Sequence, residues 1–150
     1  MTGLKEKLYK QCLDYVKTRM EAAEQGIRET QEAQNDDTKS SAGDKYETGR
    51  EMMQQETDRY MAQLDEANKL RVALGMINIT ETFTTAGPGS VIFTSNGNFY
   101  LAIGAGMIQV DEVNFYAISP ASPIGLKLTG QKAGSQFSLN GKTYLVEAIG

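Results

Sequence analysis

The sequence contains no histidine and no tryptophan, and it has a single cysteine, Cys12. Without histidine, the chain can form neither a Ser-His-Asp nor a Cys-His catalytic arrangement, and it cannot bind zinc through imidazole. One cysteine excludes an internal disulfide and a thiolate cluster, so we expect Cys12 to be ordinary helix packing. The metal ligands that remain are carboxylate and carbonyl oxygens, which suit Mg²⁺ better than zinc.

Long apolar runs are also missing, so the sequence predicts no membrane span. No apolar signal region follows Met1, and the single cysteine suits a reducing compartment, so we expect a cytoplasmic protein. The formal net charge of -4 argues against independent nucleic-acid affinity, because such affinity requires a basic surface.

Proline is absent from the first half of the chain, and charged residues are scarce in the second half. Residues 1–75 hold 12 Lys/Arg and 15 Asp/Glu, whereas residues 76–150 hold three Lys and four Asp/Glu. All three prolines lie in the second half. This step in composition predicts two domains, at 1–76 and 77–150.

The first domain has the spacing of two amphipathic helices. In its first part, residues three and four apart form a heptad seam: Leu13, Val16, Met20, Ala23, Ile27 and Thr30. In its second part a seven-residue repeat continues, with two intermediate seam positions: Tyr46, Met53, Tyr60, Ala67 and Leu74, then Leu64 and Leu70. The connection is short, so the pattern predicts an antiparallel two-helix coiled-coil hairpin.

The stretch 35–51 interrupts this helical pattern with an acidic turn near 36–44. Asp36 and Asp37 precede a small, polar segment, and Asp44 follows it. One interpretation is structural, because Asp and Ser favour turns and Asp37 or Thr38 is suited to cap a helix. The other is functional: a hairpin tip carries carboxylates to a metal site that is completed by another molecule.

The second domain changes to short apolar segments separated by turn signals. Asn96-Gly97 and Asn140-Gly141 each lie between two apolar segments, and Asn-Gly is typical of tight β-hairpins. The segments predict four or five strands, with a short helical turn over 122–128. The fold class is therefore α+β, with a helical hairpin followed by a small β-rich domain.

Several motifs together resemble one family. "YETGRE", at 46–51, resembles a Tyr-x-x-x-Arg-Glu start of a second hairpin helix, and "GSVIF", at 89–93, resembles the start of a following β domain. "AISPASPIGLKLTGQKAGS", at 117–135, resembles an Ile-Ser-x-x-Ser-Pro-[Leu/Ile]-Gly stretch, and "YLVEAI", at 144–149, resembles a last strand. These motifs are similar to those of the GreA/GreB transcript cleavage factors of bacterial RNA polymerase.

The resemblance implies an FKBP-like second domain and a role as a transcription elongation factor. In that family the β domain docks at the rim of the polymerase secondary channel, and the hairpin tip helps to position a Mg²⁺ and a water at the polymerase active centre, where backtracked RNA is cleaved. By this resemblance, the tip carboxylates act in trans and the following residues shape the docking surface: Ser122, Pro123, Ile124 and Gly125. The protein itself is then not an enzyme; it holds no cofactor in isolation, and it contacts nascent RNA only indirectly.

Three alternatives remain open at this point. Counting back from Tyr46 without gaps places Lys39 and Ala42 where that family carries its two tip acids, which is compatible with a channel-binding modulator that does not stimulate cleavage. A coiled-coil interaction protein unrelated to transcription would use the hairpin seam instead. A prolyl isomerase would need an apolar pocket lined by aromatic side chains, which the core also requires.

Overall fold

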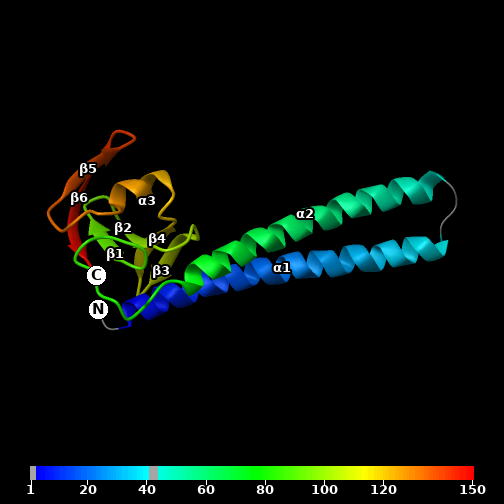
Figure 1. Cartoon of the computed structure of the whole chain (residues 1–150), viewed down its shortest axis with the longest axis horizontal. Helices are drawn as coiled ribbons and strands as arrows, with labels where there is room; N and C mark the ends of the chain where they lie inside the picture. Colours follow the sequence, from blue (N-terminus) through cyan, green and yellow to red (C-terminus); the bar gives the residue numbers. More distant parts are fainter. Residues whose placement is uncertain (1–2, 41–43) are drawn as a thin grey trace. The chain divides into compact units, whose positions relative to one another are not determined.

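The computed structural model describes residues 3–40 and 44–150, and the side chains of residues 3–33 and 49–150. Figure 1 shows its elements in chain order: α1 (Leu4–Ser40), α2 (Asp44–Gly75), β1 (Val91–Thr94), β2 (Gly97–Leu101), β3 (Gly106–Val110), β4 (Val113–Ile118), α3 (Pro123–Leu128), β5 (Gln136–Leu139) and β6 (Lys142–Ile149). The predicted order, a helical hairpin followed by a β-rich region, is confirmed, and the class is α+β.

The chain forms two compact units, one of residues 16–71 and one of residues 1–15 with 72–150. The first turns of α1 and the last turn of α2 therefore belong to the same unit as the sheet. The sequence gives no sign of this, because the predicted domains divide the chain once, between residues 76 and 77. Whether those two ranges fold independently stays a prediction.

In the unit 16–71, the helices bury the predicted seam. The following predicted positions are buried or half-buried: Val16, Met20, Ala23, Ile27, Thr30, Met53, Tyr60, Leu64, Ala67 and Leu70. Thr57 joins them with 8% exposure, and the sequence analysis missed it because threonine is polar. The side chain of Tyr46 lies outside the described residues.

The two helices of this unit run antiparallel. Gly26 of α1 packs against Tyr60 of α2, whereas Ala22, one turn earlier in α1, shares a groove with Ala67 and Leu70, which come later in α2. Because α1 positions that come later meet α2 positions that come earlier, the seam has the register of an antiparallel coiled coil. The predicted antiparallel arrangement is confirmed within this unit.

The helices extend further toward their connection than predicted. α1 continues to Ser40 and α2 begins at Asp44, so the interruption predicted over 35–51 is too long. The physical reason is that no glycine or proline stands between Gly26 and Gly43, and nothing therefore ends α1 earlier. Asp36 and Asp37 thus lie within α1, and the interpretation of Asp37 or Thr38 as a helix N-cap is wrong.

The second unit is built on a six-stranded sheet with the order β3-β4-β2-β1-β6-β5. Neighbouring strands are antiparallel, except that β2 and β4 pair in parallel, with Phe99 opposite Tyr116 and Tyr100 opposite Ala117. Six strands are found where four or five were predicted. The Asn140-Gly141 turn joins β5 to β6, with φ of 52° and 80°, as the hairpin signal predicts.

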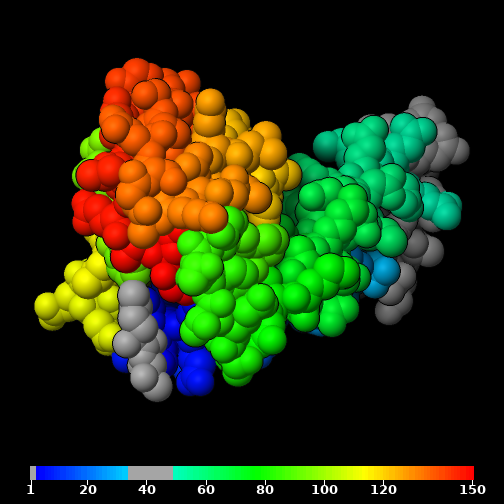
Figure 2. All heavy atoms as spheres, turned by 60° about the vertical axis from the view of Figure 1, so that its left-hand side comes forward, coloured from blue at the N-terminus to red at the C-terminus, as the bar shows by residue number. Residues whose placement is uncertain are grey.

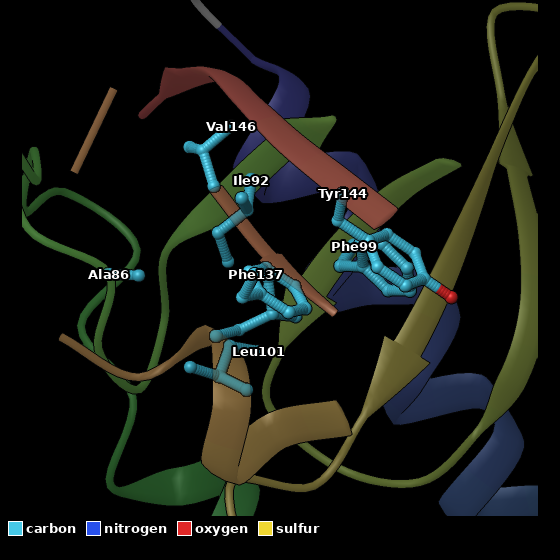
Figure 3. Close-up of a cluster of buried hydrophobic side chains, with 8 residues drawn as sticks. Ala86, Ile92, Phe99, Leu101, Phe137, Tyr144 and Val146 are labelled. Carbon is cyan, nitrogen blue, oxygen red and sulfur yellow. The ribbon is translucent and has the colours of Figure 1, made fainter. Parts of the chain in front are cut away.

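Both faces of this sheet are covered within the unit. Phe99 and Tyr100 are adjacent in β2, so their side chains lie on opposite faces. Phe99 belongs to a cluster that also contains Leu128 of α3 and the following residues, most of them drawn in Figure 3: Ala86, Ile92, Leu101, Phe137, Tyr144 and Val146. Tyr100 faces the first turns of α1, where Leu8 and Cys12 are fully buried.

The segment that joins α2 to β1 completes this unit. Ala86 exchanges backbone hydrogen bonds with the connection that follows α3: its N–H donates to the Gln131 carbonyl at 2.8 Å, and it accepts from Gly130 N–H at 2.9 Å. Figure 2 shows this segment, in light green, against the orange α3 region. α3 is thereby held between the connecting segment and the sheet.

Candidate functional site

The predicted tip acids lie at the ends of the two hairpin helices. Asp36 and Asp37 are in the last two turns of α1, and Asp44 is the first residue of α2. Their side chains lie outside the described residues. The helix bounds place these three positions at the connected end of the hairpin. Because their side chains are not described, the roles of their carboxylates stay predictions.

The helix dipole gives the two ends different meanings. A carboxylate is favourable at the N-terminus of a helix, and Asp44 at the start of α2 has this position. At a C-terminus, where the backbone carbonyls make a negative pole, a carboxylate costs about 0.3–1 kcal/mol. Asp37, in the last turn of α1, has this unfavourable position. The helix dipole therefore favours a carboxylate at Asp44 and opposes one at Asp37.

The predicted docking motif forms the start of α3. Ser122 is its N-cap: the hydroxyl accepts the Gly125 N–H at 3.1 Å and donates to the Ser119 carbonyl at 2.6 Å. Pro123 follows at the first helical position, where its missing N–H and fixed φ are compatible with the helix. The short helix predicted over 122–128 is confirmed, with Pro123–Leu128 as its bounds.

Gly125 is required by packing. A Cβ at this position would lie 2.0 Å from the Ser119 carbonyl oxygen, so no other residue fits without moving the backbone. Ile124 is half-buried and packs against the core cluster on the α3 face of the sheet. Of the four predicted docking residues, only Pro123 is exposed, and Leu126, which the sequence analysis did not select, is 68% exposed beside it.

Aromatic side chains form a continuous row on the α3 face of the sheet. The rings of Phe137 and Tyr144 stack with centroids 5.0 Å apart, and Phe99 contacts Tyr144 and Tyr116 with centroids 6.1 and 5.8 Å apart. In Figure 3 the Tyr144 hydroxyl points away from the cluster. Tyr116, at the end of the row, is 44% exposed and lies opposite Met107, which is 60% exposed. This exposed pair was not selected from the sequence either.

A further cavity, of about 400 Å³, lies between the first turn of α1 and the segment 79–82. Lys5 lines it, donating from Nζ to the Glu81 carbonyl at 2.6 Å and lying 4.5 Å from the centroid of the Phe83 ring. Burial lowers the pKa of the Lys5 ammonium, and the Glu81 charge partly opposes this. Because Lys5 is already bonded to the protein, its main role is to hold the 79–83 segment against α1.

The first turns of α1 are bonded to the edge strand β3. The Gln11 amide donates to the Gln109 carbonyl, and the Lys7 ammonium lies 3.0 Å from the Asp111 carboxylate. Cys12, between these contacts and the sheet, is a free, buried thiol whose pKa burial raises to about 12. The expectation that Cys12 is ordinary packing is confirmed.

The described residues contain neither a carboxylate or thiolate metal site nor a helix suited to a membrane. Within residues 3–33 and 49–150, no three or more Asp, Glu or Cys side chains are close enough together to hold a metal ion. No described helix combines the length and the apolar character that crossing a membrane requires. Comparisons with known proteins also gave no match, either to a family model or to a curated protein.

Proposed function

We propose that this protein binds RNA polymerase in its secondary channel and promotes cleavage of backtracked RNA by the polymerase. The observation that carries the proposal is the hairpin itself: two antiparallel helices, of 37 and 32 residues, whose neighbouring ends carry Asp36, Asp37 and Asp44. Four motifs support it, because they resemble those of transcript cleavage factors and are spread from the hairpin to the last strand: 46–51, 89–93, 117–135 and 144–149.

The chemistry fits the donor atoms that this chain offers. Carboxylate oxygens are ligands that Mg²⁺ prefers, and three of them at one end of a hairpin suffice to complete a site shared with another protein, although they are too few to form one alone. A Mg²⁺ shared with the polymerase would activate the attacking water in phosphodiester hydrolysis, and Asp36, Asp37 and Asp44 would contribute oxygen ligands to it. The role of the aspartates is to hold and orient this shared metal ion. The complete active centre belongs to the polymerase, so this chain is not itself an enzyme.

The docking surface of this proposal is centred on the start of α3. Pro123 and Leu126 are its exposed residues, whereas Ser122, Ile124 and Gly125 give that surface its shape. The proposed partner is a bacterial RNA polymerase in the cytoplasm, and RNA is reached only through it.

The test uses a purified cognate polymerase that holds backtracked RNA, with Mg²⁺ present. The wild-type chain should co-migrate with the polymerase and shorten the transcript. Replacing all three tip aspartates with asparagine should abolish the shortening and leave co-migration intact. The matched control is Asp58→Asn with Asp65→Asn and Glu66→Gln, which changes the same number of charges on exposed residues away from the tip.

Two outcomes would favour the alternatives. If the wild-type chain binds and slows RNA synthesis but never shortens the transcript, the protein is a channel-binding modulator; Lys39 and Ala42 near the tip favour this second candidate. If the chain does not bind polymerase at all, and Met53→Glu in the seam abolishes its biological activity while tip variants retain it, the protein is a coiled-coil interaction protein.

A further inference from the structure

One contact in the hairpin depends on the absence of a side chain. Gly26 is buried in the middle of α1, and a Cβ there would lie 2.5 Å from Cε1 and 2.6 Å from Cδ1 and Cζ of the Tyr60 ring. Atoms do not approach this closely, so any side chain at this position would force the Tyr60 ring to move from the place it occupies over the glycine. Tyr60 is thus a knob in a hole made by Gly26, the packing that defines a coiled coil.

Helix formation does not favour a glycine at position 26. Glycine is less favourable than alanine in a helix interior, and Gly26 has a full helical turn on both sides. The Thr30 hydroxyl donates to the Gly26 carbonyl at 2.8 Å, which braces the backbone at this point. The Tyr60 ring also has a cation partner, because the Arg59 guanidinium lies 5.4 Å from the ring centroid.

The larger seam residues beside this contact, Ile27 and Leu64, are half-buried. Its fully buried neighbours have small or short side chains, Ala23, Thr30, Thr57 and Ala67. Such residues pack similarly when one helix slides past the other, whereas a large ring over a glycine fits in one register only. Among the described side chains of residues 16–71, Tyr60 is the one aromatic.

We infer that the Gly26–Tyr60 contact is a positioning device that fixes the axial register of α1 against α2. It thereby sets where Asp36 and Asp37 stand relative to Asp44. Because Asp36 and Asp37 are on α1 and Asp44 is on α2, a shifted register moves the first two along the hairpin axis relative to the third. The inference rests on the proposed function for its consequence, which is cleavage, but not for the register itself.

The required precision is high. A slip of one residue moves a helix by about 1.5 Å along its axis. Mg²⁺ holds its oxygen ligands at about 2.0–2.1 Å in near-ideal octahedral geometry, so a carboxylate displaced by one residue leaves the coordination shell. Misplacement by about 1 Å is enough to cost roughly a hundredfold in rate.

The experiment uses the full chain and measures register and cleavage separately. Spin labels at Glu21→Cys and Met52→Cys, both exposed and on different helices, lie roughly 20 Å apart along the hairpin axis when Gly26 is opposite Tyr60, so the distance between them reports axial slip. Gly26→Ala should shift or broaden this distance by about 1 Å or more. It should lower transcript cleavage at least about tenfold, while affinity for the polymerase stays within about threefold.

The matched control is Gly75→Ala, because a Cβ at Gly75 would meet nothing within 4 Å. It should change neither the label distance nor cleavage. Gly26→Ala combined with Tyr60→Leu exchanges the glycine and ring for a common alanine–leucine contact, and it should restore a single narrow distance and most of the cleavage. Tyr60→Leu alone, which introduces no clash, should broaden the distance and keeps the inference testable if Gly26→Ala does not fold.

The inference is overturned if Gly26→Ala and Tyr60→Leu both leave the label distance unchanged. It is equally overturned if the distance shifts and cleavage does not change, because the register then does not position the acids. If the wild-type chain fails to stimulate cleavage, the proposed function is wrong and the positioning role falls with it. The label distances would still decide whether this contact fixes the register.

Discussion

Removing the Ser122 hydroxyl separates the structural role of the α3 motif from its proposed docking role. In Ser122→Ala, the buried Gly125 loses the hydroxyl that accepts its N–H at 3.1 Å. The Ser119 carbonyl keeps one partner, because it also accepts the Ser122 backbone N–H at 3.1 Å. The substitution therefore leaves the Gly125 N–H unpaired, whereas the Ser119 carbonyl stays paired. It also removes the N-cap of α3.

The expected cost is about 1–2 kcal/mol. Loss of a serine N-cap costs typically about 1 kcal/mol, and a buried unpaired N–H costs about 1–3 kcal/mol. These two figures describe the same lost bond, so they are not added. With a urea m-value of about 2 kcal/mol per molar, the unfolding midpoint followed by circular dichroism should fall by roughly 0.5–1 M. The m-value itself should not change.

Two variants control this experiment. Ser122→Thr keeps the hydroxyl and should stay within about 0.5 kcal/mol of the wild type. Ser119→Ala removes a different hydroxyl, which accepts the Ala121 N–H at an exposed turn, and it should cost less than about 0.5 kcal/mol. If Ser122→Ala leaves the midpoint unchanged but abolishes binding to polymerase at a temperature where both proteins are folded, the capping argument is refuted and Ser122 contacts the partner directly.

Three further predictions concern buried polar groups. Tyr100→Phe should leave the melting temperature unchanged or raise it, because the Tyr100 hydroxyl is buried and has no hydrogen-bond partner among the described residues. Thr57→Val should stabilise the hairpin by about 1 kcal/mol for the same reason, whereas Thr30→Val should not, since its hydroxyl is bonded; thermal melts at 222 nm compare them. Cys12 should react with thiol reagents only on unfolding. Because burial raises its pKa from 9.0 to about 12, its contribution to stability should be complete below about pH 9 and lost as the pH rises toward 12.

The parts of the fold that could be predicted are those in which local sequence decides the structure. The heptad spacing identified both helices, because burial repeats with the helical period along each of them. The two Asn-Gly pairs identified two hairpins, because only residues that tolerate positive φ fit those turns. The third tight turn was missed: Asp111 and Glu112 have φ of 50° and 67° without a glycine, and no sequence signal marks it.

The parts that could not be predicted depend on contacts between distant segments. The parallel pairing of β2 with β4 joins strands that are not consecutive, and alternation of apolar residues does not encode which strands become neighbours. Residues 1–15 group with the sheet because Leu8 and Cys12 of α1 are buried in the same unit as Tyr100 of β2. From the sequence alone, Leu8 and Cys12 would fit a coiled-coil seam equally well. The Gly26–Tyr60 contact could not be predicted for a related reason. A glycine within a heptad pattern only lowers the predicted helix stability, and its packing role becomes clear only when the distant partner residue is known.

Some residues of the candidate site and the hairpin are explained by the stability of the fold, whereas Asp37 is not favoured by it. Ser122, Gly125 and Gly26 each have a structural explanation in a hydrogen bond or a steric limit, so their presence would be expected in a protein with no partner at all. Asp37 has the opposite character. It stands at the end of α1 where the helix dipole disfavours a carboxylate, and it is not a helix N-cap. A cation shared with a partner would reverse that unfavourable interaction, because it sits well at the negative end of a helix. The helix dipole therefore opposes Asp37, and the shared metal ion of the proposed function would account for an acid at this position.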